Sequence, residues 1–269
     1  MLTVLLVPNT EKEGAAYYAE MVCAYLKDKA EILYYKDGFC DFDKVDIIIV
    51  FGGDGTLLET ASYSSKHKIP VLGINLGSLG FLAEVEKHEI TESLDKLLSG
   101  DYTVEERMML HARLVSKDGK KQEFDCLNDF VISRANQGGL VDLKLYIGDE
   151  PVEDFKADGI IFATPTGSSA YSLSAGGPFL DPSVSAFLIT PVCPHSIYSR
   201  AIVYSSDKEI SITPNQKNNS ETVVIGDGRV LAELKSSDRL IITKSHLTTK
   251  LIRLKNHAFY NTLKNKLMH

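Results

Sequence analysis

The sequence predicts an α+β protein, with an α/β domain over residues 1–103 and a β-rich domain of stacked sheets over residues 104–250. In the first hundred residues, apolar runs alternate with helical periodicity, which is typical of parallel strands joined by helices. Beyond residue 104, short apolar runs are separated by turn dipeptides such as Asp118-Gly119, which is typical of antiparallel hairpins. A chain of 269 residues is long enough for two such domains.

The N-terminal domain is predicted to alternate strands with helices. Residues 2–7 are an apolar run, as expected of a strand that is buried on both faces, and residues 46–51 are a short β-branched strand that ends in glycines. Residues 15–26 repeat apolar side chains at helical spacing, and a later helix ends at Gly100, a residue that commonly closes helices. The remaining elements are strands at 31–35 and 70–75 and helices at 57–65 and 90–98.

The C-terminal domain is predicted to consist mainly of short strands. They are expected at 107–117, 124–134, 141–147, 159–163, 201–204, 209–213, 221–225, 229–234 and 239–243. Residues 258–266 have helical character, and we expect residues 251–269 to pack back on the N-terminal domain.

Composition and charge narrow the functional classes. The net charge of −7 argues against a protein that binds nucleic acid by neutralising phosphates. No run approaches the length of a membrane-spanning helix, so we expect no membrane partner. The cysteines include no C-x-x-C pair and the histidines no H-E-x-x-H motif, which argues against redox and zinc sites. We therefore expect a reduced, cytoplasmic protein.

The strongest chemical signal is the segment Gly-Gly-Asp-Gly-Thr at 52–56, which follows an apolar strand and precedes a helix. Glycines there let backbone N–H groups approach an anion, and the helix adds the positive end of its dipole. Asp54 would repel a phosphate unless it binds a cation or accepts a proton, and both roles fit phosphoryl transfer. The alternative is a tight turn in which Asp54 is a solvated helix cap. No lysine follows the glycines, as one would in a Walker loop.

A second polar segment, residues 164–172, follows the apolar run 159–163. Its hydroxyl side chains offer hydrogen bonds, and the ring of Tyr171 suits a flat base. The alternative is a polar loop with a helix N-cap at Ser168 or Ser169.

Several polar positions allow two interpretations. Asn128 and Asp129 interrupt an apolar run and need partners, either a ribose or neighbours within a β-bulge. Lys156 and Asp158 share a face if the following strand includes them, either as an ion pair or as part of a site. Asp227 and the glycine after it have the form of a two-residue hairpin turn.

Taken together, these segments resemble the NAD kinase family. The matching stretches are GGDGT at 52–56, GINLGSLGFL at 73–82, LNDF at 127–130, KADGIIFATPTGSSAYSLSAGGP at 156–178, ITPVCPHS at 189–196 and IGDG at 225–228. They follow the family's order. GGDG alone also occurs in lipid kinases and phosphofructokinases, whereas its combination with TPTGSSAYS and a following GGP is specific.

The resemblance implies phosphorylation of NAD at the 2′-hydroxyl of its adenosine ribose, with ATP or polyphosphate as donor. It also implies a divalent metal, with magnesium expected, and a homo-oligomer, either a tetramer or a dimer. The metal ligands are not assigned. The alternatives are a lipid kinase, which the acidic chain without a basic amphipathic helix disfavours, and a non-catalytic NAD(P) sensor, which would not need Asp54.

Residue by residue, the resemblance implies that Asp54 is the catalytic base. The implied phosphate or ATP loop is Gly52, Gly53, Gly55 and Thr56. The residues implied to bind NAD are Asp54, Gly55, Asn128, Asp129, Lys156, Asp158, Thr166, Ser169, Ala170, Tyr171, Ser174 and Asp227. Asp129 replaces the family's glutamate, which shortens its reach, and Arg229 replaces a glutamine.

Overall fold

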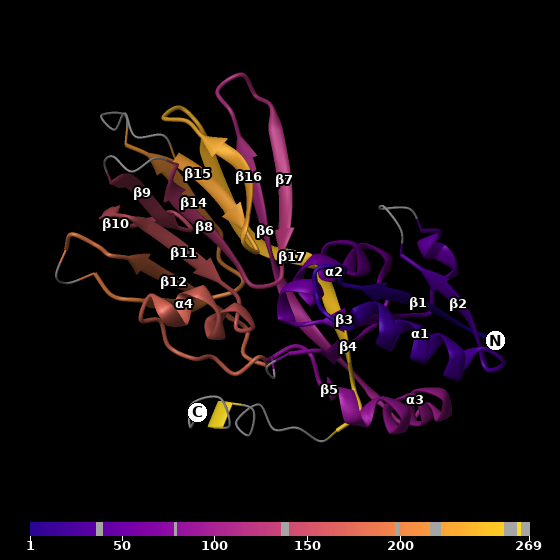
Figure 1. The fold of residues 1–269 in the computed structure, drawn as a ribbon. Helices are drawn as coiled ribbons and strands as arrows, with labels where there is room; N and C mark the ends of the chain where they lie inside the picture. Colours follow the sequence, from indigo (N-terminus) through magenta and orange to yellow (C-terminus); the bar gives the residue numbers. More distant parts are fainter. Residues whose placement is uncertain are drawn as a thin grey trace. The chain divides into compact units, whose positions relative to one another are not determined.

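The structure, a computed structural model, describes residues 1–35, 40–77, 80–135, 140–196, 199–215, 222–255 and 263–264. The chain divides into two compact units, which we call unit 1 (Met1–Arg107 with Thr248–His269) and unit 2 (Met108–Leu247). Unit 1 is α/β and unit 2 is rich in β-strands, so the predicted fold class is confirmed (Figure 1). Within the described parts of the chain, no helix has the length and apolar character that crossing a bilayer requires.

Unit 1 is built on parallel strands in the order β4-β3-β1-β2. The chain runs outward from β1 to β2 and returns to β3 on the other side of β1, so the winding reverses between β1 and β3. Ligands of open α/β sheets bind beyond the carboxyl ends of the strands at such a reversal. The strands are β1 (Leu2–Pro8), β2 (Ala30–Tyr34), β3 (Ile47–Gly52), β4 (Val71–Asn75) and β5 (Val85–Glu86), which pairs with β4.

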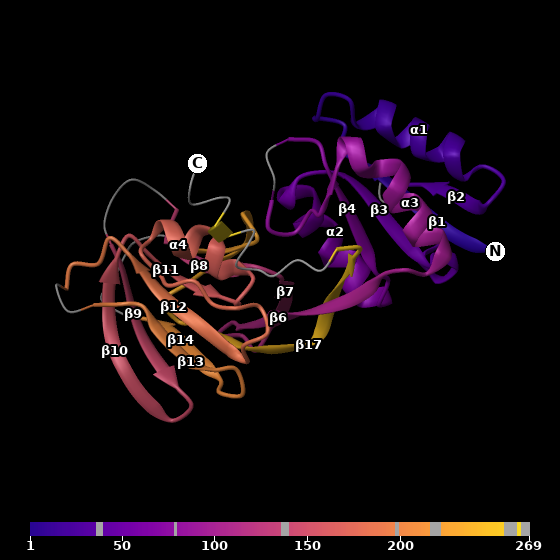
Figure 2. The ribbon, with the colours of Figure 1, turned by 90° about the horizontal axis from the view of Figure 1, so that it is seen from below.

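Helices cover both faces of this sheet. Figure 2 shows α1 and α3 together on one face and α2 on the other. The face under α1 and α3 buries alternate strand residues such as Val4 and Leu6 against Ala19 and Leu94. Gly100 closes α3 in the left-handed conformation, as its sequence position predicts. The helices are α1 (Ala15–Leu26), α2 (Asp54–His67) and α3 (Ile90–Ser99), with 3-10 turns at Phe42–Lys44 and Lys87–Glu89.

Unit 2 contains two antiparallel sheets with one apolar core. One sheet has the order β13-β12-β11-β8-β15-β16, and the other includes β10-β9-β14-β17, where β17 is Arg239–Arg253. Phe130 and Phe162 from the first sheet share a buried cluster with Leu143 and Ile210 from the second, which is the predicted stacking. The elements are β7 (Lys121–Cys126), β8 (Asp129–Arg134), β9 (Val141–Ile147), β10 (Glu150–Ala157), β11 (Gly159–Ala163), a 3-10 turn (Gly167–Ser169), α4 (Tyr171–Ser174), β12 (Ala186–Val192), β13 (Ile202–Ser205), β14 (Ile210–Pro214), β15 (Thr222–Gly226) and β16 (Arg229–Leu234).

Two strands carry the chain from one unit to the other, β6 (Thr103–Val115) and β17 (Arg239–Arg253). The expected strand at 239–243 is therefore the start of a much longer strand. Its last residues lie in unit 1, where Leu251 pairs with Val71 of β4. The helix expected over 258–266 falls outside the described residues except for 263–264.

One strand prediction is wrong, and the difference lies at residues that are candidates for the functional site. The sequence predicts a single strand at 124–134, but the chain forms β7 and β8 with a break between them. The backbone N–H groups of Leu127 and Asn128 donate to the carboxylate of Asp227 instead of to a neighbouring strand. The structure also contains β10 and β12, which the sequence analysis does not predict.

Candidate functional site

A pocket of about 510 Å³ lies at the carboxyl ends of β1, β3 and β4 in unit 1. All four residues of the expected phosphate loop line it, together with Asp54. The loop after β1 contributes Asn9, Glu11 and Lys12, and the segment after β4 contributes Gly77 and Gly80. The pocket thus lies where the winding of the sheet reverses, the position at which this class of sheet binds ligands.

The three glycines of the turn after β3 differ in whether the structure requires a glycine at their position. A Cβ atom on Gly52 would lie 2.3 Å from the Oγ1 atom of Thr56, so Gly52 allows α2 to start close against β3. Gly53 and Gly55 have open space around them, and neither has a positive φ. Neither packing nor backbone strain therefore requires glycine at these two positions, which leaves their bare backbone facing the pocket.

The carboxylate of Asp54 is held by three successive backbone amides. Its Oδ2 accepts from the N–H of Phe81 at 2.7 Å, and its Oδ1 accepts from Leu82 at 3.1 Å and Ala83 at 3.3 Å. Gly80 permits this approach, because a Cβ there would lie 1.9 Å from Oδ1. Gly53 and not Asp54 is the N-cap residue of α2, and the Asp54 carboxylate binds amides outside this helix, so the interpretation as a solvated cap is wrong. A carboxylate has about four accepting positions, so one remains on Oδ2.

The loop after β1 is fastened to the first turn of α2. The side-chain amide of Asn9 donates to the Oγ1 of Thr56 at 2.8 Å and accepts from the N–H of Glu11 at 3.0 Å. This loop brings the exposed Lys12 to the pocket, where it is the one cationic side chain among the described lining residues. Asn9 and Lys12 are not among the residues predicted from the sequence motifs, although their place directly after the first strand indicates a position at the carboxyl edge of the sheet.

In unit 2, Asp227 has two structural roles. It forms the predicted hairpin turn between β15 and β16, where φ is 45° at Asp227 and 81° at Gly228. Its carboxylate also accepts from three successive amides, at 2.8 Å from Leu127, 2.8 Å from Asn128 and 3.2 Å from Asp129. The turn therefore fixes the break between β7 and β8.

The neighbouring carboxylate of Asp129 is buried and 5% exposed. Burial and, to a smaller extent, the charge of Asp227 raise the pKa of Asp129 to about 7. Burial also raises the pKa of Asp227, although its three amide donors and Arg229 oppose the shift. Nothing in the described part of the chain donates a hydrogen bond to the Asp129 carboxylate, so this buried group is available to a polar ligand.

The polar loop after β11 packs against the same break. The side chain of Thr164 donates to the carbonyl of Leu127 at 2.6 Å, and its N–H donates to the carbonyl of Asn128 at 2.9 Å. A Cβ on Gly167 would lie 2.1 Å from that same Asn128 oxygen. The structure therefore brings Asn128, Asp129, Asp227 and the start of this loop together.

Neither Ser168 nor Ser169 is a helix N-cap, contrary to the alternative interpretation. The side chain of Ser168 donates to the carbonyl of Pro165, and that of Ser169 donates to the carbonyl of Thr166. Tyr171 begins α4 with 47% of its surface exposed, so its ring is accessible to a ligand. Thr166 is buried, Ala170 is half-buried just before α4, and Ser174 is exposed at its end.

Lys156 and Asp158 lie apart from this cluster. Lys156 belongs to β10 and pairs with Asp142 at 3.6 Å, whereas Asp158 lies between β10 and β11 and pairs with Arg134 at 3.5 Å. They therefore neither share a strand nor pair with each other, so the interpretation of these two residues as an ion pair is wrong. The loop at 164–174 follows the opposite end of β11, on the order of 20 Å away along an extended strand.

The described residues contain no group of three or more His, Cys, Asp or Glu side chains that could hold a metal ion. The carboxylates that line the unit 1 pocket are Glu11, Asp54 and Glu59. Magnesium in phosphoryl-transfer sites is commonly held by one or two carboxylates together with substrate phosphates. This donor set therefore fits an ion that is completed by phosphate oxygens.

Comparison with known proteins finds similarity along nearly the whole chain. The ATP-NAD kinase N-terminal domain matches residues 34–102, and the ATP-NAD kinase C-terminal domain matches residues 127–254. A protein named NAD kinase from Thermoanaerobacter pseudethanolicus is 39% identical over 99% of both chains. One of the same name from Carboxydothermus hydrogenoformans is 42% identical over 84% of this chain and 80% of its own.

Two solved structures have the same fold. Yeast NADH kinase, complexed with NADH, aligns with a TM-score of 0.89 at 24% identity, covering 100% of this chain and 87% of its own. An NAD kinase from Archaeoglobus fulgidus, in complex with ATP, aligns with a TM-score of 0.77 at 22% identity, covering 100% and 99%.

Proposed function

The chain belongs to the NAD kinase family, and from this premise we propose that it transfers a phosphoryl group from ATP or polyphosphate to the 2′-hydroxyl of the adenosine ribose of NAD. The observation that carries the proposal is the carboxylate of Asp54. It lines the pocket at the reversal of the sheet, is fixed by three amides and retains one accepting position.

In the proposed reaction, the 2′-hydroxyl donates a hydrogen bond to Oδ2 of Asp54. As the ribose oxygen attacks the terminal phosphorus of the donor, its proton passes to the carboxylate and the bond to the bridging oxygen breaks. NADP and ADP, or a shortened polyphosphate, are the products. A ribose hydroxyl is a weak nucleophile at neutral pH, so a positioned base lowers the barrier.

The donor phosphates are proposed to bind in the unit 1 pocket. The support is the bare backbone at Gly53 and Gly55, the N-terminal end of α2 and the ammonium group of Lys12. A divalent ion, with magnesium expected, would be held by pocket carboxylates other than that of Asp54 and by the phosphates, and would neutralise charge that develops during transfer. Lys12 supplies a cation that the glycine turn itself lacks.

The dinucleotide is proposed to contact the cluster in unit 2. Asn128, the buried Asp129 and the loop residues Thr166, Ser169, Ala170 and Ser174 offer polar groups, and the exposed ring of Tyr171 offers a stacking surface. Asp227 is assigned a positioning role, because it lies in the hairpin turn between β15 and β16 and its carboxylate holds the amides of the segment that carries Asn128 and Asp129. This differs from the sequence expectation that it faces the substrate.

Lys156 and Asp158 fit the proposal only in an assembly. They flank the start of β11, whereas the loop at 164–174 follows its end. We therefore propose a homo-oligomer, a tetramer or a dimer, in which these two side chains approach a dinucleotide bound to a neighbouring copy. The expectation of a cytoplasmic protein stays a prediction from the sequence.

The direct test is to incubate the purified protein with NAD, ATP and magnesium and to assay NADP with an NADP-specific dehydrogenase. Parallel reactions with polyphosphate, with NADH and with a chelator identify the donor, the acceptor and the metal requirement. NADP formation that depends on ATP or polyphosphate is the expected result. Binding of NAD without turnover would favour the sensor alternative, and phosphorylation of lipid vesicles without NADP would favour the lipid kinase.

A further inference from the structure

The backbone segment 80–84 holds Asp54, but it belongs to no helix or strand of its own. Its amides point at the carboxylate only if the segment is fixed from outside. One such contact is the carbonyl of Leu82, which accepts from Nη1 of Arg253 at 3.1 Å. The same residue donates its N–H to Asp54, so Leu82 links the end of β17 directly to the proposed base.

Glu84 provides the second set of contacts. Its side chain is 3% exposed and accepts from the N–H groups of Leu254 at 3.0 Å and Lys255 at 2.8 Å. Its other oxygen accepts from Arg253 at 3.3 Å. The N–H of Glu84 donates to the carbonyl of Gly73 in β4, so the segment is fixed to the sheet on one side and to the end of β17 on the other.

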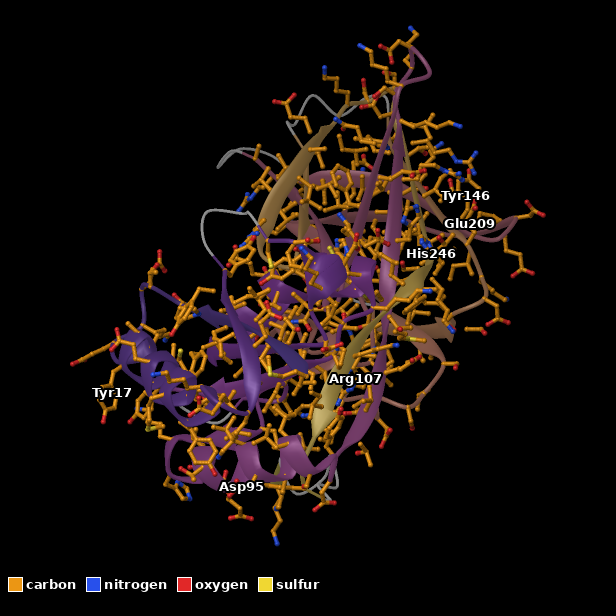
Figure 3. The ribbon with its side chains drawn as sticks, turned by 90° about the vertical axis from the view of Figure 1, so that its right-hand side faces the viewer. Tyr17, Asp95, Arg107, Tyr146, Glu209 and His246 are labelled. Atoms are coloured by element: carbon orange, nitrogen blue, oxygen red, sulfur yellow. The ribbon has the colours of Figure 1, made fainter. Side chains whose placement is uncertain are left out.

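Arg253 is itself held in one orientation. Its Nε donates to Glu105 at 2.7 Å while its Nη1 donates to Leu82 and Glu84, so the guanidinium binds three groups at once. Glu105 also pairs with Arg107 at 2.8 Å, and Arg107 lies beside β17 in Figure 3. Burial raises the pKa of Glu105, but Arg107 and Arg253 together hold it below its ordinary value. A lysine offers one point charge and does not reproduce this fork.

We propose that Arg253 and Glu84 are positioning residues for the proposed base. They hold the amides of residues 81–83 on the carboxylate of Asp54, so that its free accepting position points at the acceptor hydroxyl. The inference rests on the proposed function for its kinetic consequence. The end of β17, which follows all of unit 2 in the chain, would then have a role in a reaction centred on the turn after β3.

The experiment compares Arg253→Met, Arg253→Lys and Glu84→Gln with Arg239→Met as a matched control. Arg239 is on the same strand, but its guanidinium binds Ser211 and Glu209. Misplacing a reacting group by about 1 Å can cost about 10²-fold in rate. We expect Arg253→Met to lower kcat by about that factor with KM for NAD and ATP nearly unchanged, Arg253→Lys to restore part of the loss, and Arg239→Met to retain wild-type kcat.

A second reference variant distinguishes a loss of kcat caused by lower overall stability from a loss caused by a misplaced Asp54. Leu94→Ala removes a buried side chain from a core cluster of unit 1 to which none of the residues 80–84 belongs. If kcat falls in proportion to the melting temperature across Leu94→Ala and the Arg253 variants, the proposal is overturned. A loss of kcat at 25 °C that is confined to the Arg253 and Glu84 variants supports it.

Amide hydrogen exchange keeps this test independent of the proposed function. In Arg253→Met the amides of residues 81–83 should exchange at least about tenfold faster than in the wild type, since local opening governs exchange. They should remain protected in Leu94→Ala. Equal protection in Arg253→Met and wild type overturns the inference, even if the wild-type protein makes no NADP, which would instead refute the proposed function.

Discussion

Two aspartates in different units of this protein have the same hydrogen-bonding arrangement. Asp54 in unit 1 accepts from the amides of residues 81–83, and Asp227 in unit 2 accepts from those of residues 127–129. In each case one carboxylate oxygen accepts a hydrogen bond from one amide and the other accepts from two. The surroundings differ: Asp54 begins a long helix and lines a pocket, whereas Asp227 lies in a hairpin turn beside the buried carboxylate of Asp129.

The difference shows what three amides do in each setting. At Asp54 they fix a side chain that is open to the pocket, so the carboxylate is presented to a ligand. At Asp227 the carboxylate is the anchor, and the amides it holds belong to the segment that carries Asn128 and Asp129. Similar geometry therefore supports a chemical role in unit 1 and a positioning role in unit 2, and variants at the two sites should separate activity from stability and affinity.

The largest effect is expected from Gly80→Ala. The added Cβ would occupy the place of the Asp54 carboxylate, because it would lie 1.9 Å from Oδ1. Either the aspartate or the segment must move, and a displaced base should cost about 10²-fold in kcat. Steady-state kinetics with NAD and ATP measure the loss. Wild-type kcat in a folded Gly80→Ala protein would contradict the role assigned to this contact.

Asp227→Asn is expected to act mainly on stability and on NAD binding. Asparagine tolerates the positive φ of the turn, but its amide nitrogen cannot accept from the N–H groups of residues 127–129. Leaving buried donors unpaired costs about 1–3 kcal/mol, so urea denaturation should show a lower free energy of unfolding. KM for NAD should rise while kcat changes less than in Gly80→Ala. Unchanged stability would show that Asp227 acts only as a turn residue and that its carboxylate does not hold residues 127–129.

Tyr171 tests whether the exposed loop of unit 2 binds the dinucleotide. If its ring stacks on a base, Tyr171→Ala should weaken NAD binding by about 1–3 kcal/mol. Tyr171→Phe keeps the ring and should cost less. Isothermal titration of NAD into both variants makes the comparison, and equal losses would assign the effect to the hydroxyl group.

The last prediction concerns the pH dependence of stability at Asp129. Its pKa is about 7 in the folded protein against an ordinary value of 3.8, so between these values the folded state binds a proton that the unfolded state releases. The free energy of unfolding should therefore fall as pH rises from about 4 to about 7, by at most about 1.4 kcal/mol per pH unit from this group. Urea denaturation at pH 5 and pH 8 measures the change.

Asp129→Asn supplies the control for this pH dependence, because it removes the titrating group while keeping the shape of the side chain. The variant should lose less stability than the wild type between the two pH values. A larger loss in the variant would show that the Asp129 carboxyl does not titrate in this way.

Much of the fold is predictable because it depends on local patterns. The buried strands of unit 1 are continuous apolar runs, and Gly100 closes a helix by its own backbone conformation. The edge strand β10 escapes prediction because it carries charged residues such as Asp154 and Lys156. The break at Leu127 escapes prediction because its cause, Asp227, lies 100 residues further along the chain.

The residues of the candidate site also divide into those that a local motif predicts and those that it does not. A local motif is enough to find Asp54 and the glycine turn, and the structure places them in the pocket. Asn9, Lys12 and the amide donors of 81–83 are not assigned from the sequence, because only the order of the strands brings them to the turn after β3. Arg253 lies beyond the whole of unit 2 in sequence, and no spacing rule links it to Asp54. The sequence pattern therefore does not predict contacts that depend on the topology of the fold.

The measurement that tests the central claim most directly is single-turnover phosphoryl transfer by the wild type and by Asp54→Asn, with NAD affinity measured on the same preparations. The substitution keeps most of the shape of the side chain but removes the proton acceptor. If Asp54 is the base, the rate of NADP formation should fall by about 10²-fold or more while NAD affinity changes little. A wild-type rate of transfer in the variant would contradict the assignment of Asp54 as the base.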